Sequence, residues 1–292
     1  MTTLIEEYLN YIKNIRSYSD NTISGYQNEL AKFQNYLEEH CIDFKKITKD
    51  EIWEYLKYLD TLKYSNTSIS RHISALRSFY NYLKQKEIIE NNIFKTIRNP
   101  KIKRKLPNVL NYEEIHELFE FKECNTLKEY LTRALFELFY ATGLRISELV
   151  SIKLEDINFS EQSLRVLGKG KKMRIVYFGE YARDALTDYL SIRKTLQKKP
   201  TDYLFLNLHG NPMNRRTAEE IIYKRVEEVS LNHHISAHTL RHTFATHMLE
   251  NGADIRTVQE LLGHEKLSTT QIYTHLTSDY LRQEYFKKMP RK

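Results

Sequence analysis

The sequence predicts a mainly α-helical protein with one small antiparallel β-sheet, organised as two domains. Apolar residues recur at helical spacing through most of the 292 residues, a length that suits one or two domains. Val, Ile and aromatic residues are concentrated between residues 163 and 178, which favours a β-hairpin there. Residues 1–99 contain Gly25 and no proline, whereas Pro100 and Pro107 bracket a basic stretch typical of an extended linker. We therefore expect a helical domain over 1–98, a basic linker over 99–107 and a larger mixed domain over 108–292.

The overall composition excludes several classes of protein. Hydrophobic residues make up 41% of the chain and charged residues 28%, which argues against a disordered chain. No apolar stretch reaches the roughly 20 residues that a membrane helix needs, and the acidic residues in the opening MTTLIEEYLNYIKNI argue against a signal peptide. Cys41 and Cys124 are the only cysteines, so no disulfide framework is implied and a cytoplasmic protein is expected. The net charge of +7 favours an anionic partner without identifying one.

The first domain is expected to consist of four amphipathic helices that bury one shared core. Thr48 and Glu51 form a capping box at the start of the third helix. On the fourth helix, Arg71, Arg77 and Lys84 lie outside the apolar stripe. They are candidates for contact with phosphate groups, and a solvated helix surface explains them equally well. The apolar positions at helical spacing are Leu4, Ile5, Tyr8, Leu9 and Ile12; Ile23, Tyr26, Leu30, Phe33 and Leu37; Ile52, Tyr55, Leu56 and Leu59; and Ile69, Ile73, Leu76, Tyr80 and Leu83.

The helices of the second domain are delimited by capping residues and glycines. Asn111 and Glu114 form a capping box at the start of the first helix, and a long apolar helix that follows ends at Gly143. The last third of the chain is expected to be helical, with helix ends at Gly252 and Gly263.

Between these helices the pattern changes to that of strands. Residues 163–167 and 174–178 are predicted to form a β-hairpin whose tip, Gly-Lys-Gly, is basic. Residues 203–206 are a candidate for one further short strand.

Familiar cofactor and metal motifs are absent from the sequence. There is no Walker A sequence, no complete dinucleotide-binding glycine fingerprint, no HExxH and no GxSxG. His238 and His242 are four residues apart on an expected helix, a spacing that can hold a metal ion, but the glutamate of a zinc hydrolase does not follow the first histidine. We therefore expect neither a metal site nor a bound cofactor.

Six cationic, imidazole and phenolic side chains lie in short segments marked by glycine. Taken alone, each has an ordinary structural explanation: Arg145, for example, can pair with Glu148 one turn later. Taken together they suit phosphoryl transfer. Two arginines can hold the non-bridging oxygens of a phosphate, a tyrosine can attack phosphorus once a histidine removes its proton, and a lysine can protonate the leaving alkoxide. The six residues are Arg145, Lys169, His238, Arg241, His264 and Tyr273.

The segments that carry these residues resemble the tyrosine recombinase (phage integrase) family. ATGLRISEL, VLGKGKKMRIV, HTLRHTFATHMLENGADIRTVQELLGH and STTQIYTHL resemble its catalytic segments, the last two those of the Xer subgroup. TSISRHISALRSFYNYL resembles its core-binding domain. The resemblance implies a helical core-binding domain and a mixed α+β catalytic domain. It also implies that Arg145, Arg241 and His264 hold the scissile phosphate, that Lys169 is the general acid and His238 the general base, and that Tyr273 forms a 3′-phosphotyrosyl link.

The function implied by this resemblance is site-specific recombination of double-stranded DNA by a homo- or hetero-tetramer, without metal or ATP. Because no module precedes the core-binding domain, Xer-like resolution of chromosome or plasmid dimers is favoured. An integrase or excisionase of a phage or mobile element is the alternative, and a type IB topoisomerase and a catalytically silent DNA-binding protein are more remote. Ala237, Met173 and Tyr177 differ from the residues more common in the Xer subgroup and bear on the subgroup rather than on the chemistry.

Basic residues and the C-terminal tail are expected to make the intermolecular contacts. In the resembled family the tail docks on a neighbouring subunit, and the spacing suits packing on its own domain equally well. The apolar residues of the tail are Leu276, Tyr280, Leu281 and Tyr285. The residues expected to contact DNA are Arg71, Arg77, Lys84, Lys101, Lys103, Arg104, Lys105, Lys171 and Lys172.

Overall fold

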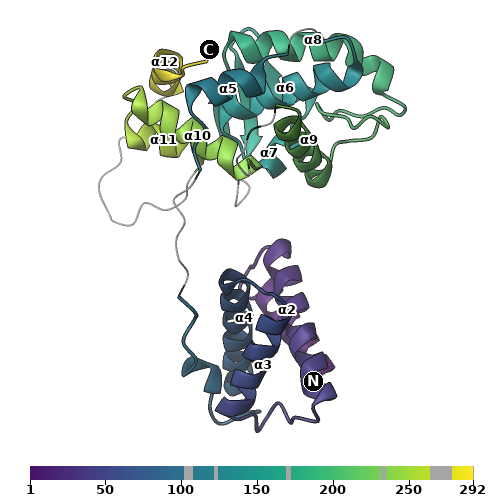
Figure 1. Ribbon diagram of the computed structural model, residues 1–292, viewed down its shortest axis with the longest axis vertical. Coiled ribbons are helices and arrows are strands. Elements are labelled where there is room, and N and C mark those ends of the chain that lie inside the picture. Colours follow the sequence, from purple (N-terminus) through teal and green to yellow (C-terminus); the bar gives the residue numbers. More distant parts are fainter. Residues whose placement is uncertain are drawn as a thin grey trace. The chain divides into compact units, whose positions relative to one another are not determined.

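The computed structural model describes residues 1–101, 108–121, 124–168, 172–229, 231, 235–263 and 278–291. The chain forms two compact units, Met1–Lys105 and Leu106–Lys292, which are described separately (Figure 1). Most of the described residues are helical, and the strands form a single small sheet, as predicted. No helix in the described ranges is long and apolar enough to cross a membrane.

The N-terminal unit is a bundle of four helices followed by one 3₁₀ turn. Ser19 and Ser65 accept hydrogen bonds from backbone amides in the first turns of the second and fourth helices, and the predicted capping box of Thr48 and Glu51 is present. The core is rich in aromatic residues, with Phe33 fully buried at its centre against the rings of Tyr55 and Phe94. The elements are α1 (Thr2–Asn14), α2 (Asp20–Glu39), α3 (Lys49–Thr61), α4 (Asn66–Gln85) and η1 (Ile93–Lys95).

The C-terminal unit is built around one buried helix, α6 (Leu127–Thr142). Its residues from Ala134 to Thr142 are all buried, because α8 and α10 pack against it. Gly143 ends α6 in the left-handed region, and the predicted capping box of Asn111 and Glu114 opens the first helix of the unit. The remaining helices are α5 (Tyr112–Phe119), α7 (Ile146–Val150), η2 (Leu154–Asp156), α8 (Glu180–Leu196), α9 (Arg215–Glu228), α10 (Ala237–Glu250), α11 (Ile255–Leu262) and α12 (Ser278–Lys288).

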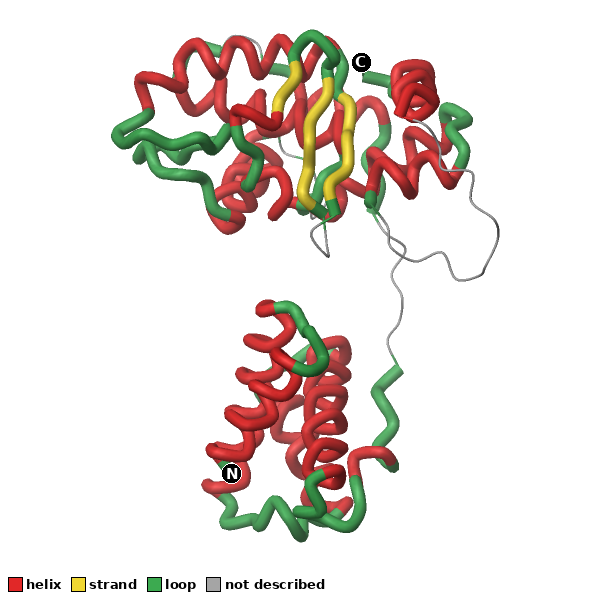
Figure 2. The backbone as a smooth tube through the Cα atoms, turned by 180° about the vertical axis from the view of Figure 1, so that it is seen from behind, coloured by secondary structure: helices red, strands yellow, loops and turns green. Residues whose placement is uncertain are grey.

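The sheet contains the predicted hairpin and a third strand that was not predicted. Strands β2 (Ser163–Leu167) and β3 (Met173–Tyr177) pair antiparallel, and β1 (Ile157–Asn158) adds to the edge of β2 (Figure 2). The predicted strand at 203–206 is wrong: Tyr203 and Leu206 make only isolated bridges. One physical reason is that Arg193 donates to the carbonyl oxygens of Tyr203 and Leu204, which occupies backbone groups that a sheet ladder would use.

The described part of the tail packs on its own unit. Tyr285 in α12 is fully buried and Met289 nearly so. Arg291 binds both carboxylate oxygens of the buried Glu137, with Nη2 at 2.6 Å from Oε1 and Nε at 2.9 Å from Oε2. Of the two arrangements left open by the sequence, the single chain therefore shows packing of the tail on its own unit.

Candidate active site

Gly143 brings Arg145 and Arg241 together. Its φ of 55° ends α6, and a Cβ at this position would collide with the ring of Phe244 in α10. Since glycine leaves this space open, α10 lies directly against the end of α6. Arg241, on α10, then donates from Nη1 to the carbonyl oxygen of Gly143 at 2.6 Å, two residues before Arg145.

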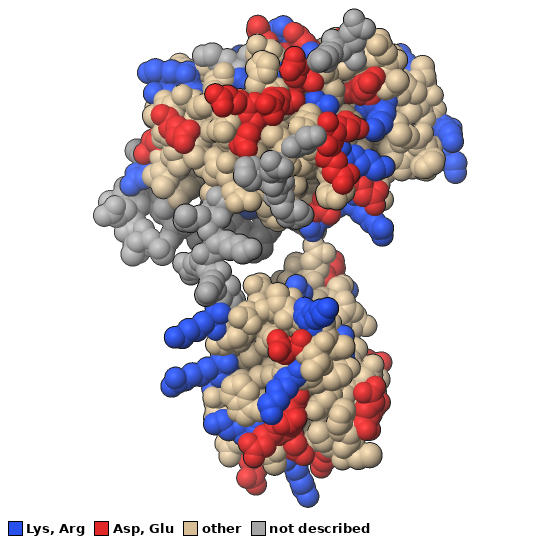
Figure 3. Space-filling view, viewed as in Figure 1, with Lys and Arg blue, Asp and Glu red and all other residues tan. Residues whose placement is uncertain are grey.

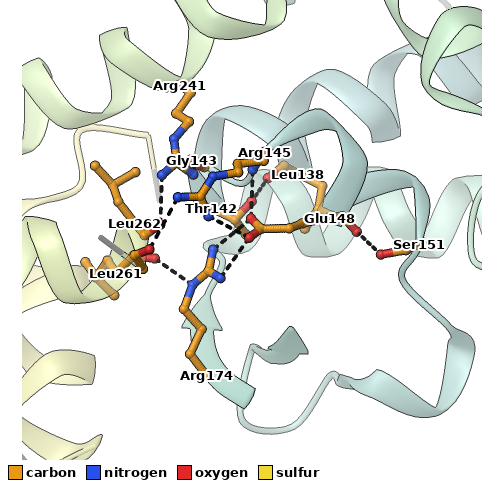
Figure 4. Close-up of polar contacts among 11 residues, drawn as sticks. Leu138, Thr142, Gly143, Arg145, Glu148, Ser151, Arg174, Arg241, Leu261 and Leu262 are labelled. Carbon is orange, nitrogen blue, oxygen red and sulfur yellow. Dashed lines mark hydrogen bonds and ion pairs between the residues drawn. The ribbon is translucent and has the colours of Figure 1, made fainter. Parts of the chain in front are cut away.

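Three arginine side chains converge on the C-terminal end of α11 (Figure 4). They come from the loop after α6, from β3 and from α10, and they donate to three consecutive carbonyl groups. The carbonyl end of a helix carries partial negative charge, so it attracts these cations. The hydrogen bonds run from Arg174 Nε to Leu261 O (3.2 Å), from Arg241 Nη2 to Leu262 O (2.7 Å) and from Arg145 Nη2 to Gly263 O (3.3 Å).

Glu148 is the carboxylate at the centre of this cluster, with 6% of its side chain exposed. It accepts from the Arg145 amide at 2.9 Å and from Arg145 Nη1 at 2.9 Å, so the local pair expected from the sequence is present. Arg174 binds the same carboxylate through Nη1 (3.1 Å) and Nη2 (2.9 Å). Burial by itself raises the pKa of Glu148, but the hydrogen bonds from Arg174 and Arg145 outweigh it and hold that pKa below its usual range.

Positive charge exceeds negative charge among these residues. Burial, and then the nearby Arg145, lower the pKa of Arg241 to about 10, although Glu148 partly opposes the shift. Three guanidinium groups, those of Arg145, Arg174 and Arg241, surround the one carboxylate of Glu148, so their charge is incompletely compensated. An anion placed between Arg145 and Arg241 would therefore be bound favourably, as a phosphate clamp requires.

The pKa of Glu148 leads to a prediction about stability. Because the pKa is lower in the folded than in the unfolded chain, the contribution is full well above the unfolded value near 4.5 and is lost as pH falls toward the folded value. We expect Glu148→Gln to destabilise the C-terminal unit by about 3 kcal/mol at neutral pH, since it breaks a buried ion pair. The difference in unfolding free energy between Glu148→Gln and wild type should be smaller at pH 4 than at neutral pH, as measured by calorimetry of the full chain. Glu219→Gln, which removes only a surface pair with Arg215, is the control, and an equal Glu148→Gln deficit at both pH values would contradict this account.

Two family descriptions match the sequence. "Phage integrase family" matches residues 108–279, and "Phage integrase, N-terminal SAM-like domain" matches residues 5–87. The chain is 42% identical to tyrosine recombinase XerC of Listeria welshimeri serovar 6b over 296 residues, covering 99% of this chain and 98% of the relative. The chain belongs to the phage integrase family of tyrosine recombinases. It is thus an enzyme of the class that cleaves and rejoins DNA.

Further similarities place Xer proteins among the relatives of this recombinase. Tyrosine recombinase XerD of Staphylococcus aureus (strain N315) is 42% identical over 296 residues, covering 100% of both chains. The crystal structure of XerH bound to a palindromic difH substrate in a post-cleavage complex matches with a TM-score of 0.72 and 25% identity, covering 90% of this chain and 78% of that one.

The structure describes three of the six predicted catalytic residues of the recombinase. Arg145 and Arg241 are brought together, as the phosphate-clamp prediction requires. His238 is exposed in the first turn of α10, three residues before Arg241 and so on the same side of that helix. Its neighbour Ala237, where proline is common in the subgroup, occupies the first helical position and follows the capping residue Ser236. Lys169, His264 and Tyr273 lie outside the described residues.

His238 and His242, the pair whose spacing can hold a metal ion, both lie on α10. His242 is exposed on α10. Within the ranges that the structure describes, no group of three or more His, Cys, Asp or Glu side chains is arranged to hold a metal ion.

The predicted DNA contacts of the N-terminal unit differ in how their side chains are used. Arg77 donates to the carbonyl oxygens of Phe94 and Ile97 and to the side chain of Asn99, so it fastens the segment after α4. Arg71 is 66% exposed and pairs with Glu29, and Lys84 is exposed and donates to Asn91. Arg71, Arg77 and Lys84 stay predictions.

The other predicted DNA contacts lie in or near the linker and the hairpin tip. Lys101 and Lys172 are exposed. The face seen in Figure 3 shows basic and acidic side chains interspersed on each unit, so the net positive charge is not gathered there. Four of the predicted contacts lie outside the described residues: Lys103, Arg104, Lys105 and Lys171.

The sequence analysis did not single out Arg174, which the structure places at the centre of the cluster. One signal was available. Side chains alternate along a strand, so Arg174 shares a face of β3 with the buried Val176 and is paired with Val166 on β2. An arginine on the inner face of a strand calls for a buried acidic partner, which Glu148 provides.

Proposed function

We propose that this protein is a site-specific recombinase of the Xer type that resolves dimers of circular chromosomes or plasmids in the cytoplasm. The observation that supports this most directly is the convergence of the Arg145 and Arg241 guanidinium groups at one point. The similarity to XerC and XerD over essentially the whole chain supports the Xer assignment over that of a mobile-element integrase.

In the proposed reaction the two arginines bind the non-bridging oxygens of the scissile phosphate. A guanidinium has five N–H donors. The hydrogen bonds to described residues use Nη1 and Nη2 of each arginine once, so each retains donors for phosphate oxygens. Fixed cations of this kind stabilise the negative charge that grows in the transition state. His264 adds one more hydrogen bond to the phosphate in this scheme.

The covalent steps follow from the remaining residues. The Tyr273 oxygen attacks phosphorus as its proton passes to His238, the bond from phosphorus to the 5′ oxygen breaks, and that oxygen takes a proton from Lys169. The product is a 3′-phosphotyrosyl ester and a free 5′-hydroxyl. Attack by the 5′-hydroxyl of a second strand reverses the step and releases Tyr273. The ester conserves the free energy of the broken bond, so no ATP is needed.

The proposed role of Lys169 as general acid can be tested by changing the leaving group of the DNA substrate. Lys169→Ala should slow cleavage of an ordinary nicked substrate by about 10²- to 10⁴-fold, the usual contribution of a general acid. A substrate with sulfur at the 5′ bridging position has a leaving group that needs no proton. We expect this substrate to restore most of the rate of Lys169→Ala while changing the wild-type rate little. If the variant stays equally slow on both substrates, Lys169 is not the acid.

The arginine clamp supplies the positive charge that a metal ion supplies in many phosphoryl transferases. We therefore expect the rate of covalent adduct formation in excess EDTA to stay within about twofold of the rate with Mg²⁺. A loss of adduct in EDTA that Mg²⁺ restores would contradict the proposed chemistry.

Assembly on DNA is the second part of the proposal. We expect a tetramer in which α12 leaves its own unit and docks in the same way on a neighbour, so that the buried Tyr285 and the pair of Arg291 with Glu137 form between subunits. The contacts with DNA are expected from Arg71, Arg77, Lys84, Lys101, Lys172 and the basic residues of the linker and hairpin tip.

The function as a whole is tested by trapping covalent complexes on genomic DNA fragments and sequencing the bound DNA. We expect one enriched site, and we expect a plasmid with two direct copies of it to be resolved into two circles. Relaxation of unrelated supercoiled DNA without pairing of sites would indicate a topoisomerase. Binding without any adduct would indicate a catalytically silent protein.

A further inference from the structure

Arg174 has no role in the chemistry described above, yet its side chain contacts three of the described segments that lead into the candidate active site. It lies on β3, with 14% of its side chain exposed. Its contacts reach α7, the end of α11 and the hairpin strand β2 (Figure 4).

The first contact fixes Arg145 through Glu148. Arg174 binds both oxygens of the Glu148 carboxylate, at 3.1 and 2.9 Å. The same two oxygens accept from the Arg145 side chain and from the Arg145 amide. A carboxylate held from one side by a bidentate guanidinium has a single orientation. The position of Arg145 therefore depends on Arg174 through Glu148.

The other contacts of Arg174 fix the end of α11 and the residue that follows β2. Arg174 Nε donates to Leu261 O at 3.2 Å, near the end of α11. A Cβ on Gly263 would lie 3.0 Å from Arg174 Cζ, and a Cβ on Gly168 would lie 3.1 Å from Arg174 Nη1. Both glycines thus lie in close contact with the guanidinium. In the sequence, Gly168 immediately precedes Lys169 and Gly263 immediately precedes His264.

Arginine is required here because of the number and directions of these bonds. Nη1, Nη2 and Nε of Arg174 each donate within one plane, two to Glu148 and one to Leu261 O. A lysine keeps the charge but has a single nitrogen, so it cannot reach the carboxylate and the carbonyl group with the same geometry.

We propose that Arg174 is a positioning residue for DNA cleavage: without contacting DNA, it sets the orientation of Arg145 and the starting points of the segments that carry Lys169 and His264. This inference rests on the proposed function. It adds a seventh residue to the six that the proposed function assigns to cleavage. It also explains the glycines at positions 168 and 263, because a side chain at either position would crowd the Arg174 guanidinium.

The test compares Arg174→Met and Arg174→Lys with wild type in the full chain, on a nicked duplex that carries the trapped genomic site. We expect adduct formation at saturating DNA to be at least tenfold slower in both variants, with the dissociation constant for DNA within about threefold of wild type. Arg165→Met is the matched control, because Arg165 lies on the adjacent strand β2, is 60% exposed and should leave the rate unchanged. Wild-type cleavage by Arg174→Met, or full recovery with Arg174→Lys, would overturn the proposal.

A second readout separates positioning from general stability. If Arg174 sets the position of Lys169, the 5′-phosphorothiolate substrate should reduce the defect of Arg174→Met severalfold and leave the Arg165→Met rate unchanged. A defect of the same size on both substrates would overturn this part of the inference, because loss of folded protein slows both alike.

Gly168→Ala covers the case in which Arg174→Met does not fold. The conformation of Gly168 is open to alanine, so the strain comes from the approach of Arg174 Nη1. We expect Gly168→Ala to slow adduct formation about tenfold in the wild-type background, and to add little to Arg174→Met where that variant folds. A wild-type rate for Gly168→Ala would overturn the inference. Absence of any adduct with the wild-type chain would instead refute the proposed function itself.

Discussion

Tyr273→Phe is expected to bind DNA with unchanged affinity and to form no covalent adduct. The substitution removes one oxygen atom, which is the nucleophile of the proposed reaction, and leaves the ring in place. The loss should exceed the detection limit of a gel assay with a nicked suicide substrate, since no other group supplies the attacking oxygen. A filter-binding or gel-shift measurement in the same samples checks that the DNA complex still forms.

The matched control for this substitution is Tyr280→Phe. Tyr280 lies seven residues further along the chain, in α12, and 41% of it is exposed. We expect Tyr280→Phe to cleave DNA at the wild-type rate. Adduct that persists in Tyr273→Phe and disappears in Tyr280→Phe would transfer the nucleophile to α12 and require a different arrangement of the tail.

Arg241→Ala and Arg145→Ala are expected to produce the second-largest effects, a reduction of adduct formation by about 10²- to 10³-fold each. Each removes one cation from the clamp. Arg241→Ala should reduce the rate more than Arg145→Ala, because the loss of Arg241 also releases the carbonyl groups of Gly143 and Leu262, which join the end of α6 to the end of α11. Rates at saturating DNA measure this effect apart from binding.

A surface arginine of the same unit serves as the control for the loss of charge. Arg183 on α8 pairs with Glu180 and Asp184 and is 40% exposed. Arg183→Ala should weaken DNA binding at most slightly and leave the cleavage rate unchanged. If Arg183→Ala and Arg241→Ala reduced the rate equally, overall charge rather than the clamp would explain the loss.

Local signals in the sequence predicted most of the fold. The capping boxes at Thr48 and Asn111 and the left-handed glycines at Gly143 and Gly263 lie where the helices begin and end, because these residues satisfy backbone groups that helix ends leave unpaired. The hairpin was also predicted from a local signal, the concentration of Val, Ile and aromatic residues on both sides of Gly-Lys-Gly. Strand β1 has only two residues and carries no periodic pattern, so it could not be predicted.

Long-range contacts explain where the prediction from sequence was incomplete. The backbone at 203–206 has strand-like residues, but the side chain of Arg193 binds the carbonyl groups there. Arg77 has the exposed-face spacing of a DNA contact, and the chain after α4 folds back to bind it. In both cases the deciding partner lies ten or more positions away along the sequence, where periodicity carries no information.

For the candidate site, the sequence predicted the chemistry but not every contact that positions the residues. The residue types suited phosphoryl transfer, which calls for two cations at one phosphate, and the family resemblance assigned that role to Arg145 and Arg241. The sequence could not show that Glu148, besides forming the local pair with Arg145, also receives Arg174 from a strand on the other side of the cluster. That connection depends on how β3 and α7 pack.

The central claim is that the two guanidinium groups neutralise one phosphate. A nicked substrate with a methylphosphonate at the scissile position tests it most directly, because a methyl group replaces one charged oxygen and removes the negative charge that the clamp binds. We predict that Arg145→Ala and Arg241→Ala lose at least tenfold less activity, relative to wild type, on this neutral substrate than on the natural one. Equal losses on the two substrates would show that these arginines do not act on the charge of the phosphate, and would contradict the account.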